Sequence, residues 1–172
     1  MIKTSIDRFN TIKSNWDQFK SDPNNKKIRI RDAAKKLNIS EAELLSTQID
    51  NVSIRYLFID NFKEFFNSIL SLDKIMLLIR NDYVVHEKII ETNNLLFEEN
   101  RLYSQEKQKN LILKFNKNTF NHSFFECKMH AGKKLYSFQF FDFMGNSILK
   151  IYLKGKAEKK FDEIALQYTS QY

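Results

Sequence analysis

The sequence predicts an α+β fold with N-terminal helices, a central antiparallel β-sheet and a C-terminal helix. Two observations carry this prediction. Apolar residues recur every three or four positions near both ends of the chain, whereas alternating, strand-like stretches follow one another between about residues 75 and 153. Strands that are not separated by helices are typical of antiparallel sheets. With 172 residues the chain can bury one hydrophobic core, so we expect a single domain over residues 1–172.

The first fifty residues predict three helices. The first follows an apolar stripe that ends before the loop at Pro23, and the second runs over about 31–37. Ser40 and Glu43 have the spacing of a capping box, which begins a short helix to about Thr47. The residues of the apolar stripe are Ile2, Ile6, Phe9, Ile12, Trp16 and Phe19.

The rest of the chain predicts strands, with one helix before them and one after. We expect a strand near 54–58, then a helix capped by Asp60 that carries a stripe of core phenylalanines. A hairpin over 75–90 has an expected tight, left-handed turn at Asn81-Asp82. Residues 93–110 have no clear pattern. Further strands are expected over 111–115, 120–128, 135–141 and 147–153, and a closing helix over about 161–168.

Composition narrows the function classes. The formal charge of +7 favours polyanions, acidic proteins or carboxylate ligands as partners. A single cysteine, Cys127, excludes an intrachain disulfide and suits a reducing compartment. The N-terminus has no apolar signal core, so we expect a soluble, cytoplasmic protein without membrane insertion. The motifs of phosphate-binding loops, of CxxC sites and of HExxH metalloproteases do not occur.

Three stretches resemble one known family. The segment RNDYVVHEK at 80–88 resembles the RNEYAVHEK-type segment of the haemin utilisation proteins of the HemS/ChuS type. Residues 29–45 and 137–153 resemble two further segments of that family, in the same order. This resemblance implies a cytoplasmic haem-binding protein that accepts haemin after uptake for trafficking or degradation. We expect binding and trafficking, because degradation needs reducing equivalents and no flavin or nicotinamide motif is visible.

Haem needs apolar walls, cations for its carboxylates and an iron ligand. His86 is the expected iron ligand, because it lies on an otherwise aliphatic strand face and the matching family His is a candidate ligand. The resemblance also implies roles for Lys114, at the position of a family Arg, and for Phe120 and His122, which match a W-x-H pattern. The remaining expected haem contacts are Lys88, Lys150 and Tyr152. The alternative for each is structural, since a His on a sheet is usually a packed residue and a Lys is usually solvated.

The resemblance also implies that a second copy of this structural unit takes part in function. Members of the HemS/ChuS type carry two copies of this unit, and this chain has the length of one. Lys63 lies where, on our alignment, the second half of those proteins has a ligating His. We therefore expect a homodimer or a partner chain, for which the single-copy ChuX/HutX relatives are a precedent. A chain that is only a structural half is another possibility.

A different function class stays open. The helices that meet at residues 38–40 also resemble a DNA-binding helix-turn-helix, which would make the chain a basic, nucleic-acid-associated regulator. However, Glu41 and Glu43 would begin the recognition helix and repel phosphates, so we expect no specific nucleic acid.

Overall fold

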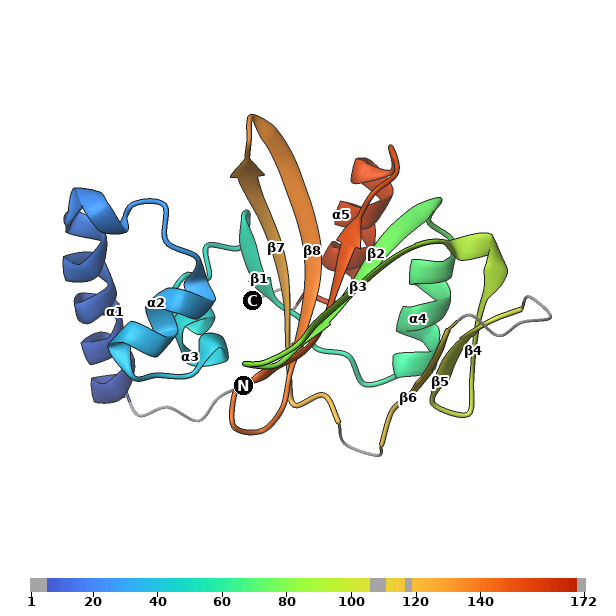
Figure 1. The fold of residues 1–172 in the computed structure, drawn as a ribbon, viewed down its shortest axis with the longest axis horizontal. Coiled ribbons are helices and arrows are strands. Elements are labelled where there is room, and N and C mark those ends of the chain that lie inside the picture. The colour runs from blue at the N-terminus through green and yellow to red at the C-terminus, as the bar shows by residue number, and fades with distance from the viewer. Residues whose placement is uncertain (1–5, 106–110, 117–118, 170–172) are drawn as a thin grey trace.

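A six-stranded antiparallel sheet divides the protein into two layers (Figure 1). The computed structural model describes residues 6–105, 111–116 and 119–169. The strand order is β1-β7-β8-β9-β2-β3. The strands are β1 (Ile54–Tyr56), β2 (Lys74–Arg80), β3 (Val85–Glu91), β7 (His122–His130), β8 (Lys133–Phe141) and β9 (Ser147–Leu153). An α+β fold with a central antiparallel sheet is therefore confirmed.

Helices α1 (Ile6–Ser21), α2 (Ile30–Leu37) and α3 (Glu41–Ser46) lie together at one end of the molecule (Figure 1). The predicted capping box is present, because the Glu43 amide donates to Ser40 Oγ and the Ser40 amide donates to the Glu43 carboxylate. Trp16, Ala33 and Leu44 join the three helices in a small core of their own. Of the predicted first stripe, Ile2 lies outside the described residues.

The other layer holds the main core. It contains α4 (Phe62–Leu70), α5 (Glu158–Gln167) and a three-stranded sheet of β4 (Leu95–Glu98), β5 (Arg101–Ser104) and β6 (Ile112–Lys114). Phenylalanine side chains fill the space, as in the stacked pair Phe138 and Phe161, whose ring centroids are 4.1 Å apart. Phe65 and Phe66 of α4 are fully buried, so the predicted phenylalanine stripe is core.

Three local predictions were wrong or incomplete. The β2–β3 turn spans four residues, 81–84, with no left-handed residue, because Asn81 Oδ1 accepts from two amides and its own amide donates to Val84 O. Asn61, rather than Asp60, caps α4 by accepting from the Glu64 amide. The segment without a clear pattern contains β4 and β5, which are joined by Glu99 and Asn100, both with positive φ.

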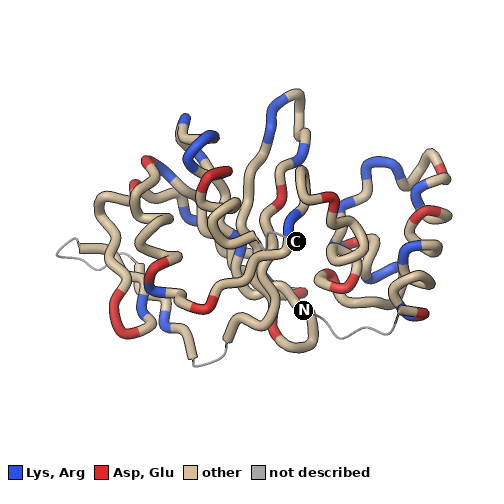
Figure 2. Tube along the Cα trace, turned by 180° about the vertical axis from the view of Figure 1, so that it is seen from behind, with Lys and Arg blue, Asp and Glu red and all other residues tan. Residues whose placement is uncertain are grey.

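Charged residues are spread over helices, loops and strand ends (Figure 2). In the described part of the chain, no helix combines the length and the apolar character needed to cross a membrane.

Candidate functional site

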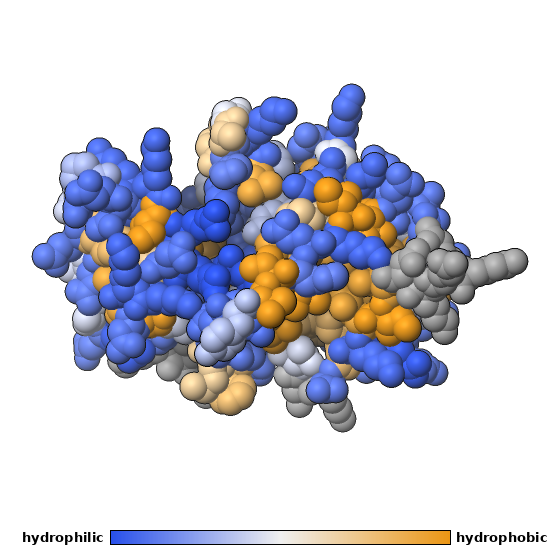
Figure 3. All heavy atoms as spheres, in the orientation of Figure 1, coloured by the Kyte–Doolittle hydropathy of each residue, from blue (hydrophilic) through white to orange (hydrophobic). Residues whose placement is uncertain are grey.

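A cleft of about 520 Å³ opens between the N-terminal helices and the adjacent face of the large sheet. Its walls come from α2, α3, β2, β3, β7, β8 and β9. The apolar part of its lining includes Met76, Leu78 and Leu135, and the rim is basic. The lining cations are Lys27, Arg29, Arg31, Arg80, Lys128, Lys150 and Lys154. We call this cavity the sheet cleft; in Figure 3 it corresponds to the hydrophilic hollow between the helical end and the sheet.

Two buried charges and one largely buried charge lie together in the sheet cleft. The Lys150 ammonium and the Arg80 guanidinium both contact the Glu41 carboxylate, with Arg80 Nη2 3.4 Å from Glu41 Oε1. The side chains of Lys150, Glu41 and Arg80 are 6%, 8% and 13% exposed. Burial lowers the pKa of Lys150, although the neighbouring Glu41 acts in the opposite direction. Two cations thus share one carboxylate away from bulk water.

A second polar group covers the sheet beside this cluster. Gln139 donates through Nε2 to Glu126 Oε2 at 2.7 Å, and Lys128 Nζ contacts the same oxygen at 2.8 Å. Gln139 Oε1 is buried, and no residue in the described part of the chain donates a hydrogen bond to it. Tyr152 also lines the cleft, and burial raises the pKa of its phenol to about 12. At neutral pH this phenol is therefore a hydrogen-bond donor and not a phenolate.

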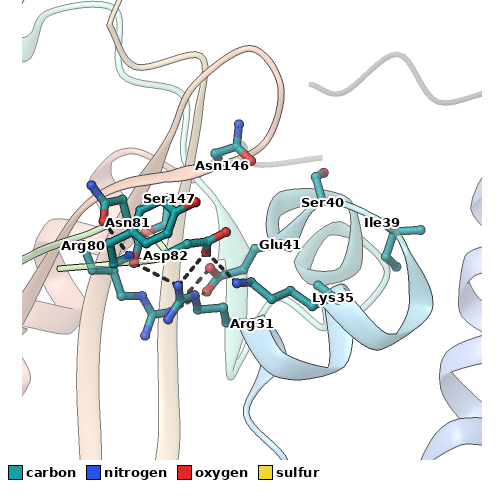
Figure 4. A pocket seen from close by; sticks show the side chains of 12 residues that line it. Arg31, Lys35, Ile39, Ser40, Glu41, Arg80, Asn81, Asp82, Asn146 and Ser147 are labelled. Atoms are coloured by element: carbon teal, nitrogen blue, oxygen red, sulfur yellow. Dashed lines mark hydrogen bonds and ion pairs between the residues drawn. The ribbon is translucent and has the colours of Figure 1, made fainter. Parts of the chain in front are cut away.

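An adjoining cavity of about 450 Å³ shares Arg31, Glu41 and Arg80 with the sheet cleft (Figure 4). Here the β2–β3 turn is tied to α2. Asp82 Oδ1 accepts from Arg31 Nη2 at 2.8 Å and from Lys35 Nζ at 2.5 Å. These two cations hold the pKa of the exposed Asp82 carboxyl below its usual value. The Asp82 carboxylate thus neutralises Arg31 and Lys35 in the cavity that adjoins the sheet cleft.

The structure separates the predicted haem contacts. Lys150 and Tyr152 line the sheet cleft. His122 is on the same face of the sheet but is buried, with Nδ1 3.5 Å from the Tyr56 hydroxyl, and burial lowers its pKa. His86 and Lys88 point to the opposite face, because they alternate with Val85 and Glu87, which line the cleft.

The other two predicted contacts lie elsewhere. Lys114 is exposed on β6, in the small sheet. The W-x-H match would place Phe120 and His122 on one face of a continuous strand, but Phe120 packs among Phe62, Phe115 and Phe140 on the α4 side, so that placement was wrong. The reason is that Phe120 precedes the start of β7, where strict alternation begins.

Sequence reasoning did not select His130, Glu41, Arg80 or Gln139, all of which line the sheet cleft. A signal for His130 was present, since it follows His122, Phe124, Glu126 and Lys128 at alternate positions of one strand. Glu41 and Arg80 come from distant elements, and only the packing of α3 on the sheet brings them together.

A third cavity, of about 640 Å³, lies beside the N-terminal end of α4. Its walls include Phe62, Phe66, Phe97, Phe115 and Phe120, and its lining cation is Lys63. Of the residues that the structure describes, no His or Cys lines this aromatic cavity or the one at Asp82, whereas His130 lines the sheet cleft. Among the described residues, no three His, Cys, Asp or Glu side chains form a metal-binding group.

Comparison with known proteins identifies the family. Residues 55–167 match the haem utilisation family ChuX/HutX. They contain strands β2 to β9, helices α4 and α5, and β1 except for its first residue. This chain belongs to the ChuX/HutX family. No curated protein matches its sequence.

Solved structures share the fold of this ChuX/HutX-family chain. The haem-binding protein PhuS from Pseudomonas aeruginosa has a TM-score of 0.76 at 19% identity, covering 95% of this chain and 46% of PhuS. The haem-degrading enzyme ChuS from Escherichia coli O157:H7 has a TM-score of 0.77 at 22% identity, covering 95% and 48%. ChuX has a TM-score of 0.68 at 16% identity, covering 91% and 97%. The chain thus spans about half the length of PhuS and ChuS.

The helix-turn-helix interpretation does not fit the packing of α3. Four of its six residues are buried, namely Glu41, Ala42, Leu44 and Leu45. Glu43 is occupied by Ser40 and by Arg8, whose guanidinium lies 2.8 Å away. In this ChuX/HutX-family chain the helix packs on the sheet and does not present a face to a DNA groove.

Proposed function

We propose that the protein binds haem and that the sheet cleft holds it. Membership of the haem utilisation family over residues 55–167 carries this proposal. The named relatives PhuS and ChuS are a haem-binding protein and a haem-degrading enzyme. The cleft has the chemistry that haem demands, because it combines an apolar floor, a basic rim and an imidazole.

Each part of the cleft has a role in this proposal. Met76, Leu78 and Leu135 would contact the porphyrin face, which removes apolar surface from water. The basic rim would attract the carboxylates, and the protonated Tyr152 hydroxyl would donate a hydrogen bond. His130, at the end of β7, is the imidazole within the cleft lining.

His86 remains the iron ligand that the resemblance favours, but a haem bound to His86 would have a different position. It lies exposed on the edge strand β3 and points away from the sheet cleft. It can therefore ligate only a haem that is held outside this cleft, for example one shared with a second chain. Lys88, Lys114 and Phe120 are not part of the cleft lining either, and of these only Lys88 lies on the same strand face as His86.

Titration of the full chain with haemin tests the proposal. We expect a saturable shift of the Soret band with a defined stoichiometry. An unrelated protein of similar positive charge is the control, and an identical spectrum with that control would refute haem binding.

A matched pair of variants identifies the ligand. His130→Ala should change the ligand-field spectrum if the haem occupies the sheet cleft, whereas His86→Ala should leave it unchanged. The reverse result would exclude His130 and support a haem held outside the cleft. Both histidines are exposed, so neither change should disturb folding.

Our proposal includes a trafficking role in the cytoplasm after haem uptake. The single Cys127 suits a reducing compartment. Degradation of haem would require an electron donor, so binding and transfer is the preferred activity. We also propose that two chains act together, as argued in the Discussion.

A further inference from the structure

The group formed by Glu41, Arg80 and Lys150 has hydrogen-bond donors that its own carboxylate does not fully satisfy. Arg80 Nε is buried and has no hydrogen-bond partner among the described residues. The contacts of Arg80 Nη2 with the two Glu41 oxygens, at 3.4 and 3.5 Å, are long for charged hydrogen bonds. Close by, in the same cleft, the buried Gln139 Oε1 is also unpartnered. A buried donor without a partner costs free energy that a suitable ligand group would recover.

Resting on the haem-binding function proposed above, we propose that Lys150 and Arg80 form the subsite for a ligand carboxylate, and that Glu41 occupies this subsite in the ligand-free protein. A carboxylate from the ligand would contact the same two cations and would also offer an acceptor to Arg80 Nε. Glu41 is then an internal competitor, and binding includes the displacement of its carboxylate.

The position of Glu41 makes such an exchange physically reasonable. It is the first residue of α3, where the unpaired amides of a helix N-terminus favour a negative charge, and it enters the cleft from the helical side. Lys150 and Arg80 enter from β9 and β2, on the sheet side. The three side chains thus bridge the two walls of the cleft, and the carboxylate that ties α3 to the sheet is the one the ligand must replace.

A purely structural ion pair would look similar but predicts different binding. Breaking a buried pair destabilises a protein because one charge is left without a partner. If Glu41 were only structural, Glu41→Gln would lower stability and bind the ligand no better than the unchanged protein. If Glu41 competes, Glu41→Gln frees both cations and binds a carboxylate ligand more tightly.

The test uses haemin, and haemin dimethyl ester as the probe without carboxylates. We expect Glu41→Gln to bind haemin about tenfold more tightly, a change that corresponds to about 1.4 kcal/mol. This gain should disappear with the dimethyl ester. Haemin should also raise the melting temperature of Glu41→Gln more than that of the unchanged protein. An equal or weaker haemin affinity of the folded variant, or an equal gain with the ester, would overturn the proposal.

A second pair of variants covers the case in which Glu41→Gln does not fold. Lys150→Gln alone and Lys150→Gln with Glu41→Gln both lack the buried ammonium, and the double variant replaces the ion pair by two amides. Because Arg80 remains in both, the double variant should bind haemin more tightly than Lys150→Gln. Equal affinities would refute the competition. A chain that shows no Soret shift in any form would instead refute the proposed function, so the two failures are distinguishable.

Discussion

His122 shows at the residue scale how burial changes the chemistry of a side chain. It is 9% exposed, whereas His86 and His130 are exposed. Burial favours the neutral imidazole and so lowers the pKa of His122 below its ordinary value. The unfolded chain therefore takes up a proton, at a pKa of about 6.5, before the folded protein does.

This difference predicts a pH dependence of stability. Because the unfolded state binds more protons, the free energy of unfolding should fall as the pH drops from about 7 towards 5, and it should recover as the pH rises. His122→Asn should make this slope shallower, as measured by urea unfolding at several pH values. A slope that is the same in His122→Asn and in the unchanged protein would contradict the assignment.

Arg55 is another buried titratable residue, and its charge has a structural role. Its Nη1 contacts Asp162 of α5 at 2.7 Å, its side chain is 8% exposed and its guanidinium lies 4.7 Å from the Phe125 ring centroid. Arg55→Met should lower the free energy of unfolding by about 2 kcal/mol, since a partly buried carboxylate loses its partner and a cation–π contact is lost. Lys159→Met, from the exposed pair with Glu163, should have no measurable effect. Denaturant midpoints of the two variants check this, and similar midpoints would count against it.

At the scale of elements, the attachment of the N-terminal helices to the sheet decides whether the sheet cleft exists. The turn between β8 and β9 contacts α3, where the Ala42 amide donates to Gly145 O at 3.2 Å. Gly145 has a φ of +80°, and a Cβ added there would lie 2.7 Å from Ser40 Cβ. Only glycine tolerates both the positive φ and the close approach of Ser40 at this position.

Two glycine variants separate backbone strain from steric contact. Gly145→Ala should cost about 3 kcal/mol or more, from the left-handed backbone and from the collision with Ser40. Gly132→Ala has a similar φ of +77° but open space around it, so it should cost only about 1 kcal/mol. Urea unfolding measures both. Equal losses would mean that the contact between this turn and α3 contributes little.

At the scale of the whole molecule, the β3 edge of the large sheet is an apolar edge that pairs with no further strand of the described residues. β3 is the last strand in the sheet order, and it carries Val85 and Ile89, which are 56% and 58% exposed. The neighbouring turn adds Tyr83 at 93% and Val84 at 61%. An apolar edge strand can pair with another chain, and two identical chains would associate with twofold symmetry.

We therefore predict that the protein forms a homodimer through β3. Light scattering at micromolar concentration, with and without haemin, should give the mass of two chains. Ile89→Lys should shift this mass towards one chain, because it places a charge in the pairing edge. Leu166→Lys, at an exposed position of α5, is the control and should leave the dimer intact. A strict monomer in both conditions would exclude the paired arrangement.

Local patterns explain which elements were predictable. The capping box at Ser40 and Glu43 and the phenylalanine stripe of α4 depend on neighbours within a few residues, and the structure contains both. The collinear segments at 29–45, 80–88 and 137–153 also led to the family that residues 55–167 confirm. The turn at 81–84 was mispredicted because Asn81 caps it with its side chain, which a residue-type preference for left-handed turns does not reveal.

The sequence by itself therefore determined the α+β class, the helical and strand segments outside residues 93–110 and the family, because each follows from periodicity or from contiguous residues. Only the tertiary structure decided which charges meet. Glu41, Arg80 and Lys150 come from α3, β2 and β9, and their contact depends on how the helices pack across the sheet. The same packing makes the sheet face that carries His130 a wall of the cleft, whereas His86 lies on the opposite face of the sheet. A site assembled from three distant segments leaves no local pattern, since each of its charges alone resembles an ordinary surface residue.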